Sequence, residues 1–221
     1  MSETSLRKDA EDNRRRLLVA AREVFAEHGF EATLHDVARH AGVGVGTAYR
    51  RFSNKYDLMD AILEDQVNEL EQVLRDSLAE PDAWAGIVSY LERSLAIQAR
   101  DRGMAQILSG KRITKEQYDW ERDRLAPLVT ALADRAREQR VVRPDLTGTD
   151  LIFLQIGIAA IAFTARAGAA NVDRGDVTDL YRRYLWIALD GIRARAGAVD
   201  LPVEALSTEQ THQLLGQRPI G

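Results

Sequence analysis

The stretch TLHDVARHAGVGVGTAYRRF, residues 33–52, decides how this chain folds. It places three glycines at alternate positions, Gly42, Gly44 and Gly46, and follows them with a tyrosine and two arginines. Glycine-rich loops that open a helix bind the phosphates of nucleotides, whereas basic helices bind the phosphates and base edges of DNA. The residues on either side of the glycines discriminate between these two kinds of site.

A nucleotide site does not fit the surrounding sequence. A dinucleotide-binding glycine fingerprint follows a strand, but here the glycines follow residues 34–40, an amphipathic helical segment that Thr33 and Asp36 can cap. A P-loop ends in Gly-Lys-Ser or Gly-Lys-Thr, and residues 46–48 are Gly-Thr-Ala. The sequence therefore argues against a bound nucleotide.

The same residues predict a helix-turn-helix, with one helix over 34–40, a turn at Gly42 and a second helix over 45–52. Ala48 and Phe52 lie four residues apart and are expected to face the core. The residues left on the outward face are Val45, Gly46, Thr47, Tyr49 and Arg50. Hydroxyl, phenol and guanidinium groups bind phosphates and base edges, so this face is a predicted DNA contact.

The helix-turn-helix has a second interpretation, and Gly46 needs an explanation of its own. A short helix-turn-helix can simply pack three helices together, with its arginines exposed to solvent. Gly46 costs about 1 kcal/mol relative to alanine inside a helix, and we expect a close approach to a neighbouring backbone to compensate for it.

Helical spacing of apolar residues continues along the chain and no strand-like alternation is sustained, which predicts an all-α fold. Further helices are expected at about 13–28, 55–79, 82–102, 104–109, 115–140, 149–169 and 176–196, with one more short helix in the tail STEQTHQLLG. We divide the chain into a helix-turn-helix domain at 1–55, a second helical domain at 56–200 and a tail at 201–221.

Composition restricts the function classes. The net charge is −4, and residues 1–55 carry a net +2 against −6 for the remainder, so the first quarter is the anion-facing end. There is no cysteine, no apolar leader, and the longest apolar run, 151–165, is shorter than the roughly 20 residues that span a bilayer. We expect a cytoplasmic protein that does not enter the membrane.

An enzyme is a weak alternative, because the second domain contains no nucleophile–base pair. His212 is the only histidine beyond residue 55, and the four histidines, His28, His35, His40 and His212, show no metal-ligand spacing. The segment DRGD at 173–176 lacks the later glutamate of a calcium loop. We therefore predict no metal and no cofactor.

The segment 149–169 is apolar on nearly all sides, and a helix of that kind has to be buried on more than one side. Either one protomer encloses it or a second copy covers it. Gly157, Ala159 and Ala160 would allow a close approach, and the last helix adds a stripe of Leu180, Tyr184, Ile187, Ala188 and Ile192. A four-helix bundle between two protomers is the interpretation we favour.

The run RRRLLVAAREVFAEHGFEATLHDVARHAGVGVGTAYRRFSNKYDLMDAILE, residues 14–64, resembles the N-terminal domain of the TetR (tetracycline-repressor) family. The segment YRRYLWIALDGIRA, residues 181–194, is similar to the last helix of many members. The resemblance implies about nine helices, a three-helix DNA-binding domain, and a ligand-binding domain that dimerises through its last two helices. It implies a homodimeric regulator, usually a repressor, that leaves a palindromic operator when a small molecule binds.

The resemblance also assigns site residues. Thr47, Tyr49, Arg50 and Lys55 would contact the double-stranded operator, and Thr33 would cap the second helix near a phosphate. Val45 stands where many relatives read a base, and an apolar valine suits a thymine methyl. Gly44 replaces the more usual serine cap, which costs only a few tenths of a kcal/mol, roughly, in helix stability.

The ligand pocket would form between about residues 82 and 165, and its residues are equally well explained as ordinary core. The predicted lining is Trp84, Tyr90, Leu91, Met104, Tyr118, Trp120, Phe153 and Gln155. This mixture suits a mostly apolar small molecule with few hydrogen bonds. Control by a protein partner in place of a small molecule, and activation in place of repression, are open alternatives.

Overall fold

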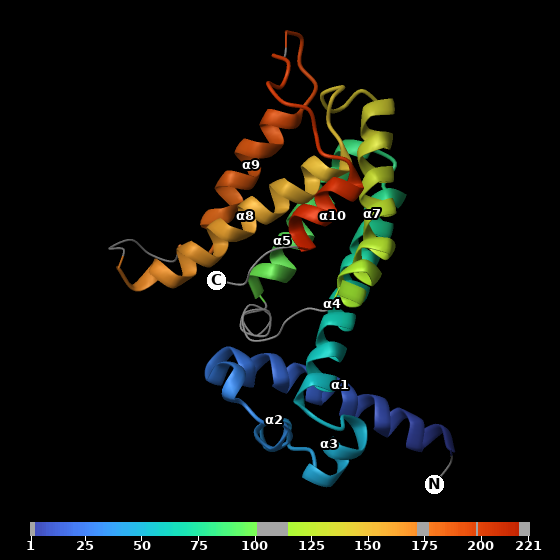
Figure 1. Ribbon diagram of the computed structural model, residues 1–221, viewed down its shortest axis with the longest axis vertical. Helices are drawn as coiled ribbons and strands as arrows, with labels where there is room; N and C mark the ends of the chain where they lie inside the picture. Colours follow the sequence, from blue (N-terminus) through green and yellow to red (C-terminus); the bar gives the residue numbers. More distant parts are fainter. Residues whose placement is uncertain (1–2, 101–114, 172–176, 198, 217–221) are drawn as a thin grey trace. The chain divides into compact units, whose positions relative to one another are not determined.

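The structure is a computed structural model and describes residues 3–100, 115–171, 177–197 and 199–216 (Figure 1). These residues form α-helices and two single 3₁₀ turns, with no strand, so the expected all-α class is confirmed. The described α-helices are α1 (Glu3–His28), α2 (Leu34–Ala41), α3 (Val45–Arg51), α4 (Lys55–Ala79), α5 (Ala83–Arg100), α7 (Lys115–Glu138), α8 (Gly148–Gly168), α9 (Leu180–Ile192) and α10 (Thr208–Gly216).

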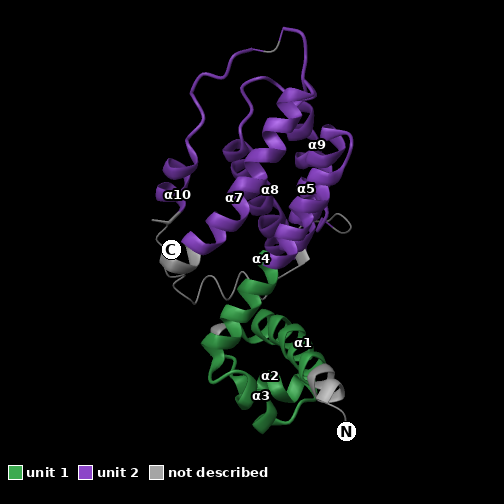
Figure 2. Cartoon of the chain, turned by 90° about the vertical axis from the view of Figure 1, so that its right-hand side faces the viewer, with its two compact units in different colours: residues 1–67, 101–113, 220–221 green, residues 68–100, 114–219 purple. Residues whose placement is uncertain are grey.

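The chain divides into two compact units, drawn in separate colours in Figure 2. The described part of the first is residues 3–67, and the second holds the described residues from Asn68 onward. The division falls inside α4, whereas the sequence division was placed at residue 55. The tail residues that form α10 belong to the second unit.

The first unit packs α2, α3 and the start of α4 against α1 around one apolar cluster. Its members are almost completely inaccessible to water and include Leu17, Ala21, Phe25, Val37, Ala38, Ala48, Leu58, Met59 and Ile62. Phe25 is the largest of these side chains and has no exposed surface. Because Ala48 and Phe52 complete this cluster from α3, their spacing fixes which face of α3 turns outward.

The second unit packs α5, α7, α8 and α9 around a larger core, with the last part of α4 and α10 against it. The helices α7 and α8 approach closely at Gly148, where a Cβ would lie 2.9 Å from the Cα atom of Thr130. Any larger residue there would force the two helices apart. The start of α8 is fixed by a capping box between Thr147 and Asp150.

Two helix boundaries differ clearly from the expected ones, and one expected helix is not described. The first helix begins at Glu3, ten residues earlier than about residue 13, because this polar segment is rich in helix-forming Glu, Lys, Arg and Ala and adds ion pairs such as Arg15–Asp12 at 3.3 Å. The last long helix ends at Ile192, since Arg193 is extended and pairs with Val142 in an isolated β-bridge. The helix expected at 104–109 lies outside the described residues.

The short helix expected in the tail is present as α10, and it lies against α7. Polar contacts hold it and the segment before it. His212 Nε2 lies 2.7 Å from Asp119 Oδ1, and the Thr149 hydroxyl donates to the Leu206 carbonyl oxygen at 2.8 Å. The tail residues therefore pack as part of the second unit.

Candidate nucleic-acid interface and ligand pocket

The turn between α2 and α3 depends on Gly42. This residue is left-handed, with φ 62° and ψ 32°, a conformation that glycine adopts without penalty. From α1, Arg16 Nη2 donates to the carbonyl oxygens of Ala41 at 2.7 Å and Gly42 at 3.3 Å. A Cβ at residue 42 would lie 3.1 Å from the same nitrogen. The turn is thus fixed both by its own backbone and by α1.

The start of α2 has the capping box that TLHD predicts. The Asp36 amide donates to the Thr33 hydroxyl at 3.2 Å, and the Thr33 amide donates back to Asp36 Oδ2 at 3.1 Å. Hydrogen bonds from the Thr33 side chain and backbone lower the pKa of Asp36. The cap is therefore fully formed at neutral pH, and the contact of Thr33 with DNA stays a prediction.

The outward face of α3 carries the predicted DNA residues. Ala48 is the only buried residue of this helix, whereas Val45, Gly46, Tyr49 and Arg50 are exposed and Thr47 is half-buried. The Tyr49 side chain is 49% exposed. Arg50 Nη2 donates to the Thr47 hydroxyl at 2.8 Å, which aligns the guanidinium beside the hydroxyl on one surface. These groups form the surface that a DNA duplex would contact.

The explanation proposed for Gly46 from the sequence is not found within the protein. No atom lies within 4 Å of the position where its Cβ would be. The helix is open there, so a close approach would have to come from a bound molecule.

Lys55 begins α4 beside this face. Asn54 accepts hydrogen bonds from the amides of Tyr56 at 2.7 Å and Asp57 at 3.1 Å and so caps the helix. The Lys55 ammonium lies 5.9 Å from the centre of the Tyr56 ring, and this ring is 48% exposed. Sequence reasoning did not single out Tyr56. Its position two residues after a capping asparagine was the available signal.

Replacing Arg50 by alanine is expected to weaken operator binding by about 1–3 kcal/mol for each half-site, or about 5- to 150-fold. Its side chain is exposed and donates a hydrogen bond to the neighbouring Thr47 hydroxyl, so the melting temperature should change by less than about 1 °C. Fluorescence anisotropy on labelled DNA and circular dichroism measure the two quantities. Arg75→Ala, which removes an exposed arginine of the second unit, is the control and should change neither. Loss of binding and stability together would make Arg50 a structural residue.

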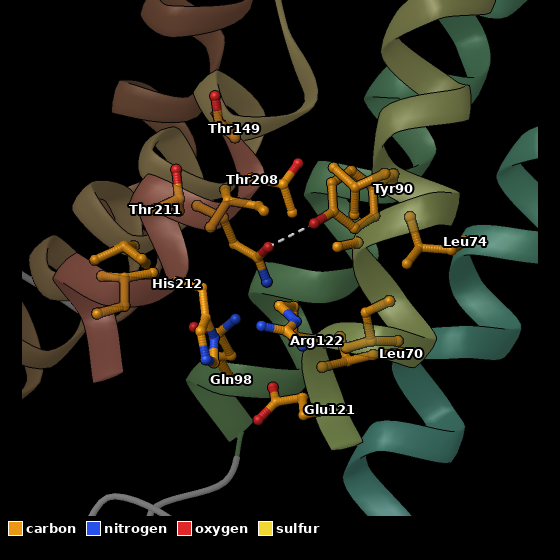
Figure 3. Close-up of a pocket in the computed structure, with 17 residues that line it drawn as sticks. Leu70, Leu74, Tyr90, Gln98, Glu121, Arg122, Thr149, Thr208, Thr211 and His212 are labelled. Atoms are coloured by element: carbon orange, nitrogen blue, oxygen red, sulfur yellow. Dashed lines mark hydrogen bonds between the residues drawn. The ribbon is translucent and has the colours of Figure 1, made fainter. Parts of the chain in front are cut away.

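The second unit contains a cavity of about 220 Å³ between α4, α5, α7, α8 and α10 (Figure 3). Its walls are mainly apolar, with a minority of polar side chains. The residues that line it are Leu70, Leu74, Tyr90, Gln98, Glu121, Arg122, Leu125, Ala126, Val129, Thr149, Ile152, Gln155, Ile156, Thr208, Thr211, His212 and Leu215. A water takes about 30 Å³ of liquid, so the cavity has room for about seven waters or a small organic molecule.

One buried hydrogen bond crosses the cavity wall, from the Tyr90 hydroxyl on α5 to Gln155 Oε1 on α8 at 2.7 Å. Burial raises the pKa of Tyr90, so its phenol stays neutral and donates. The bond fixes the orientation of the Gln155 amide, and Figure 3 draws it as the dashed line from Tyr90.

Of the six predicted ligand residues whose side chains the structure describes, two, Tyr90 and Gln155, line the cavity. Leu91 is fully buried core, and Trp84 packs on that core with Arg193 4.8 Å above its ring. Trp120 is exposed, with Arg124 against its ring, and Phe153 does not line the cavity. Met104 lies outside the described residues, as does the side chain of Tyr118. The prediction favoured large aromatic residues, because helical spacing alone does not show which apolar residues line a cavity and which lie in the packed core.

Sequence reasoning missed the α10 wall, Glu121 and Arg122. The four α10 residues in the lining, Thr208, Thr211, His212 and Leu215, follow i, i+3, i+4, i+7 spacing. This spacing places them on one face of a helix and was the signal available in the sequence. Glu121 and Arg122 lie beside each other in a strongly charged segment, and nothing in that pattern points to a cavity.

The outer surface of α8 and α9 is unusually apolar. On α9, Tyr184, Trp186 and Ile187 are exposed, Ile187 by 56%. On α8, Gly157 and Ala160 are exposed, and no atom lies within 4 Å of a Cβ built at Gly157. Two positions differ from expectation.

Ala159 and Ile192 are buried in the protomer's own core, whereas Tyr184 and Ile187 of the predicted stripe point outward. The described residues contain one helix, α8, long and apolar enough to span a bilayer by length and composition. Residues Leu151, Ile158 and Ala162 of this helix are core, and such core helices pass the same test. Within the described residues, no group of three or more His, Asp or Glu side chains could hold a metal ion.

An exposed recognition face on a capped helix-turn-helix, joined to a helical unit with a cavity, defines the class of helix-turn-helix transcriptional regulators. Residues 17–62 match the family model described as bacterial regulatory proteins, tetR family. Residues 81–194 match the model described as transcriptional regulator SbtR-like, C-terminal domain, which covers more than half of the chain. The chain belongs to the TetR family of transcriptional regulators, which are not enzymes.

Individual relatives agree with this assignment. The regulator SCO0520 of Streptomyces coelicolor is 31% identical, with a TM-score of 0.62 over 83% of this chain and 99% of that one. A TetR regulator from Mycobacterium vanbaalenii is 25% identical, with a TM-score of 0.64 over 85% and 99% of the two chains. The HTH-type regulator SrpR of Pseudomonas putida is 36% identical over 81 residues, which are 36% of this chain and 38% of SrpR. This last match therefore spans well under two thirds of the relative's length.

Proposed function

We propose that this protein is a homodimeric repressor that binds a palindromic DNA operator and is released when a small, mostly apolar molecule occupies the cavity of the second unit. The observation that carries the proposal is the outward face of α3, where Thr47, Tyr49 and Arg50 lie together while Ala48 anchors the helix. A cytoplasmic location accompanies this function, because its target is chromosomal DNA.

The exposed apolar face of α8 and α9 supports the dimer. Large exposed apolar patches on soluble proteins mark interaction surfaces, and small residues such as Gly157 let two helices approach closely. In a two-fold dimer the two recognition helices enter successive major grooves only when they are about 34–36 Å apart, or a multiple of that. The operator is then palindromic because the protein is symmetric.

We infer that α4, the helix that belongs to both units, couples the cavity to DNA binding. This helix begins at Lys55, beside the recognition face, and contributes Leu70 and Leu74 to the cavity wall. A ligand that displaces these leucines would move the helix that carries Lys55. Coupling of about 1–3 kcal/mol, a 5- to 150-fold change in operator affinity, is typical of such regulators.

The existence of a cavity in the second unit favours a small molecule over a protein partner as the effector. A protein partner would need a surface, and the apolar surface on α8 and α9 is the one assigned to the dimer.

The salt dependence of DNA binding tests the proposal. With about four cationic phosphate contacts in each protomer, log K is expected to fall with log salt at a slope near −7, or about 10⁴-fold between 50 and 200 mM. The operator is first obtained by sequencing the genomic fragments that the purified protein retains, and the titration follows by fluorescence anisotropy. Lys55→Ala should reduce the magnitude of the slope by about 2 in the dimer. A slope near zero would exclude this DNA interface.

A further inference from the structure

One end of the cavity is acidic. Among the described residues of its lining, Arg122 carries the one guanidinium, and it lies 2.7 Å from Asp123 and 3.7 Å from both Asp119 and Glu209. Glu121 is a fourth carboxylate, and it lines the cavity itself. Among the described residues, four carboxylates therefore meet one guanidinium there, and the Arg122 charge is already shared among three of them.

The Glu121 carboxylate is the group at this end that has no assigned role in the fold. Within the described part of the chain no side chain donates a hydrogen bond to it, and burial raises its pKa. Glu121 is half-buried, and a charged carboxylate that is partly removed from water is unfavourable unless a cation accompanies it. His212 does not supply that cation, because its Nε2 lies 2.7 Å from Asp119.

A second, independent observation indicates a ligand. The Thr211 side chain on α10 is only 4% exposed and lines the same cavity, and its hydroxyl has no hydrogen-bond partner among the described residues. Buried hydroxyls are normally paired, so an unpaired one on a residue of the cavity wall is a position where a ligand that enters the cavity can complete the bond. In Figure 3 Glu121 lies at the lower end of the cavity and Thr211 lies away from it, beside Thr208.

We propose that the cavity binds a small organic cation, a protonated amine on an apolar body, whose ammonium pairs with Glu121 and whose far end carries a polar atom that hydrogen-bonds Thr211. The inference rests on the proposed function in taking the cavity as the effector site. The apolar body contacts the leucine and isoleucine side chains of the wall, Leu74, Ile152 and Leu215. Arg122 stays bound to its three carboxylates and does not oppose the ammonium.

Three probes that share one framework test the charge. Tyramine, tyrosol and 4-hydroxyphenylacetate carry an ammonium, a hydroxyl and a carboxylate, respectively, opposite the same phenol. Calorimetry at about pH 7.5, where an amine of ordinary pKa is protonated, gives their affinities for the DNA-free protein. Tyramine is expected to bind about tenfold or more tightly than tyrosol, the ratio that a hydrogen bond to a charged group provides, and the carboxylate should bind least. Equal or tighter binding of tyrosol or the carboxylate, or no binding of tyramine, would overturn the proposal.

Two variants locate the contacts. Glu121→Gln should remove the advantage of tyramine over tyrosol and raise the melting temperature, because a buried charge is lost. Glu138→Gln, an exposed carboxylate on the same helix, is the matched control and should alter neither. Thr211→Val should weaken all three probes while leaving the fold at least as stable. A tyramine affinity unchanged by Glu121→Gln, or probe affinities unchanged by Thr211→Val, would contradict the assignment.

The same probes separate this inference from the proposed function. If tyramine binds as described but leaves operator affinity unchanged, the cation site stands and effector control through it is wrong. If only 4-hydroxyphenylacetate binds and releases the protein from DNA, the proposed regulator function stands and the cation site is wrong.

Discussion

Ile187→Glu is expected to convert the dimer into monomers and to lower operator affinity by about 10²–10⁴-fold, the factor that bivalent binding contributes. Ile187 is 56% exposed on α9 in the protomer, so a glutamate there costs the isolated fold little, about 0.5 kcal/mol or less. In the proposed dimer the same residue is buried against a second copy, where two unpaired charges would oppose association. Analytical ultracentrifugation and anisotropy on a full palindrome and on one half-site measure the two effects.

Val203→Glu is the control for this change, since it places the same charge on an exposed aliphatic residue outside α8 and α9. It should leave both the dimer and the operator affinity intact. Binding of the half-site should be equal for Ile187→Glu and the parent protein. A stable dimer of Ile187→Glu would show that the α8 and α9 surface is not the interface.

Phe25→Ala is expected to lower the free energy of unfolding of the first unit by about 3–5 kcal/mol. Phe25 has no exposed surface and is the largest completely buried side chain in the core between α1, α2 and α3. Domains are stable by only about 5–15 kcal/mol, so a small unit would lose most of its margin. Urea denaturation followed by circular dichroism should then show that the first unit unfolds at a lower urea concentration than the second unit. DNA binding should also be lost at about 37 °C, because little stability of the first unit remains at that temperature.

Val19→Ala removes a valine that is 50% exposed on the same helix, and its effect on stability should stay within about 0.5 kcal/mol. Leu132→Ala, in the core of the second unit, should shift the other transition and leave the first in place. A cost below about 1 kcal/mol for Phe25→Ala would mean that the core relaxes around the missing ring.

Local sequence signals predicted the first unit well because its structure is determined locally. Thr33 and Asp36 form a capping box over four residues, and Gly42 takes the one conformation that demands glycine. The spacing of Ala48 and Phe52 then fixes the outward face of α3. Each of these signals acts within a few residues, so no knowledge of distant packing was needed.

The cavity could not be predicted in the same way, because five helices far apart in sequence form it. Leu91 and Tyr90 are neighbours on α5 and have similar hydrophobic patterns, yet only Tyr90 reaches the cavity. Whether an apolar side chain lies in the packed core or lines the cavity depends on how closely the neighbouring helices pack against it. The burial of Ala159 and Ile192 in the protomer's own core was missed for a related reason, since an apolar stripe does not say whether its partner is the same chain or another.

The α10 helix has a consequence for comparing this protein with its relatives. Four of the side chains around the cavity come from residues 208–215, beyond the segment 81–194 that carries the similarity of the second unit. Two regulators could therefore share that segment closely and still sense different compounds. Effector identity should be transferred between them only where the counterparts of Thr211 and His212 also agree.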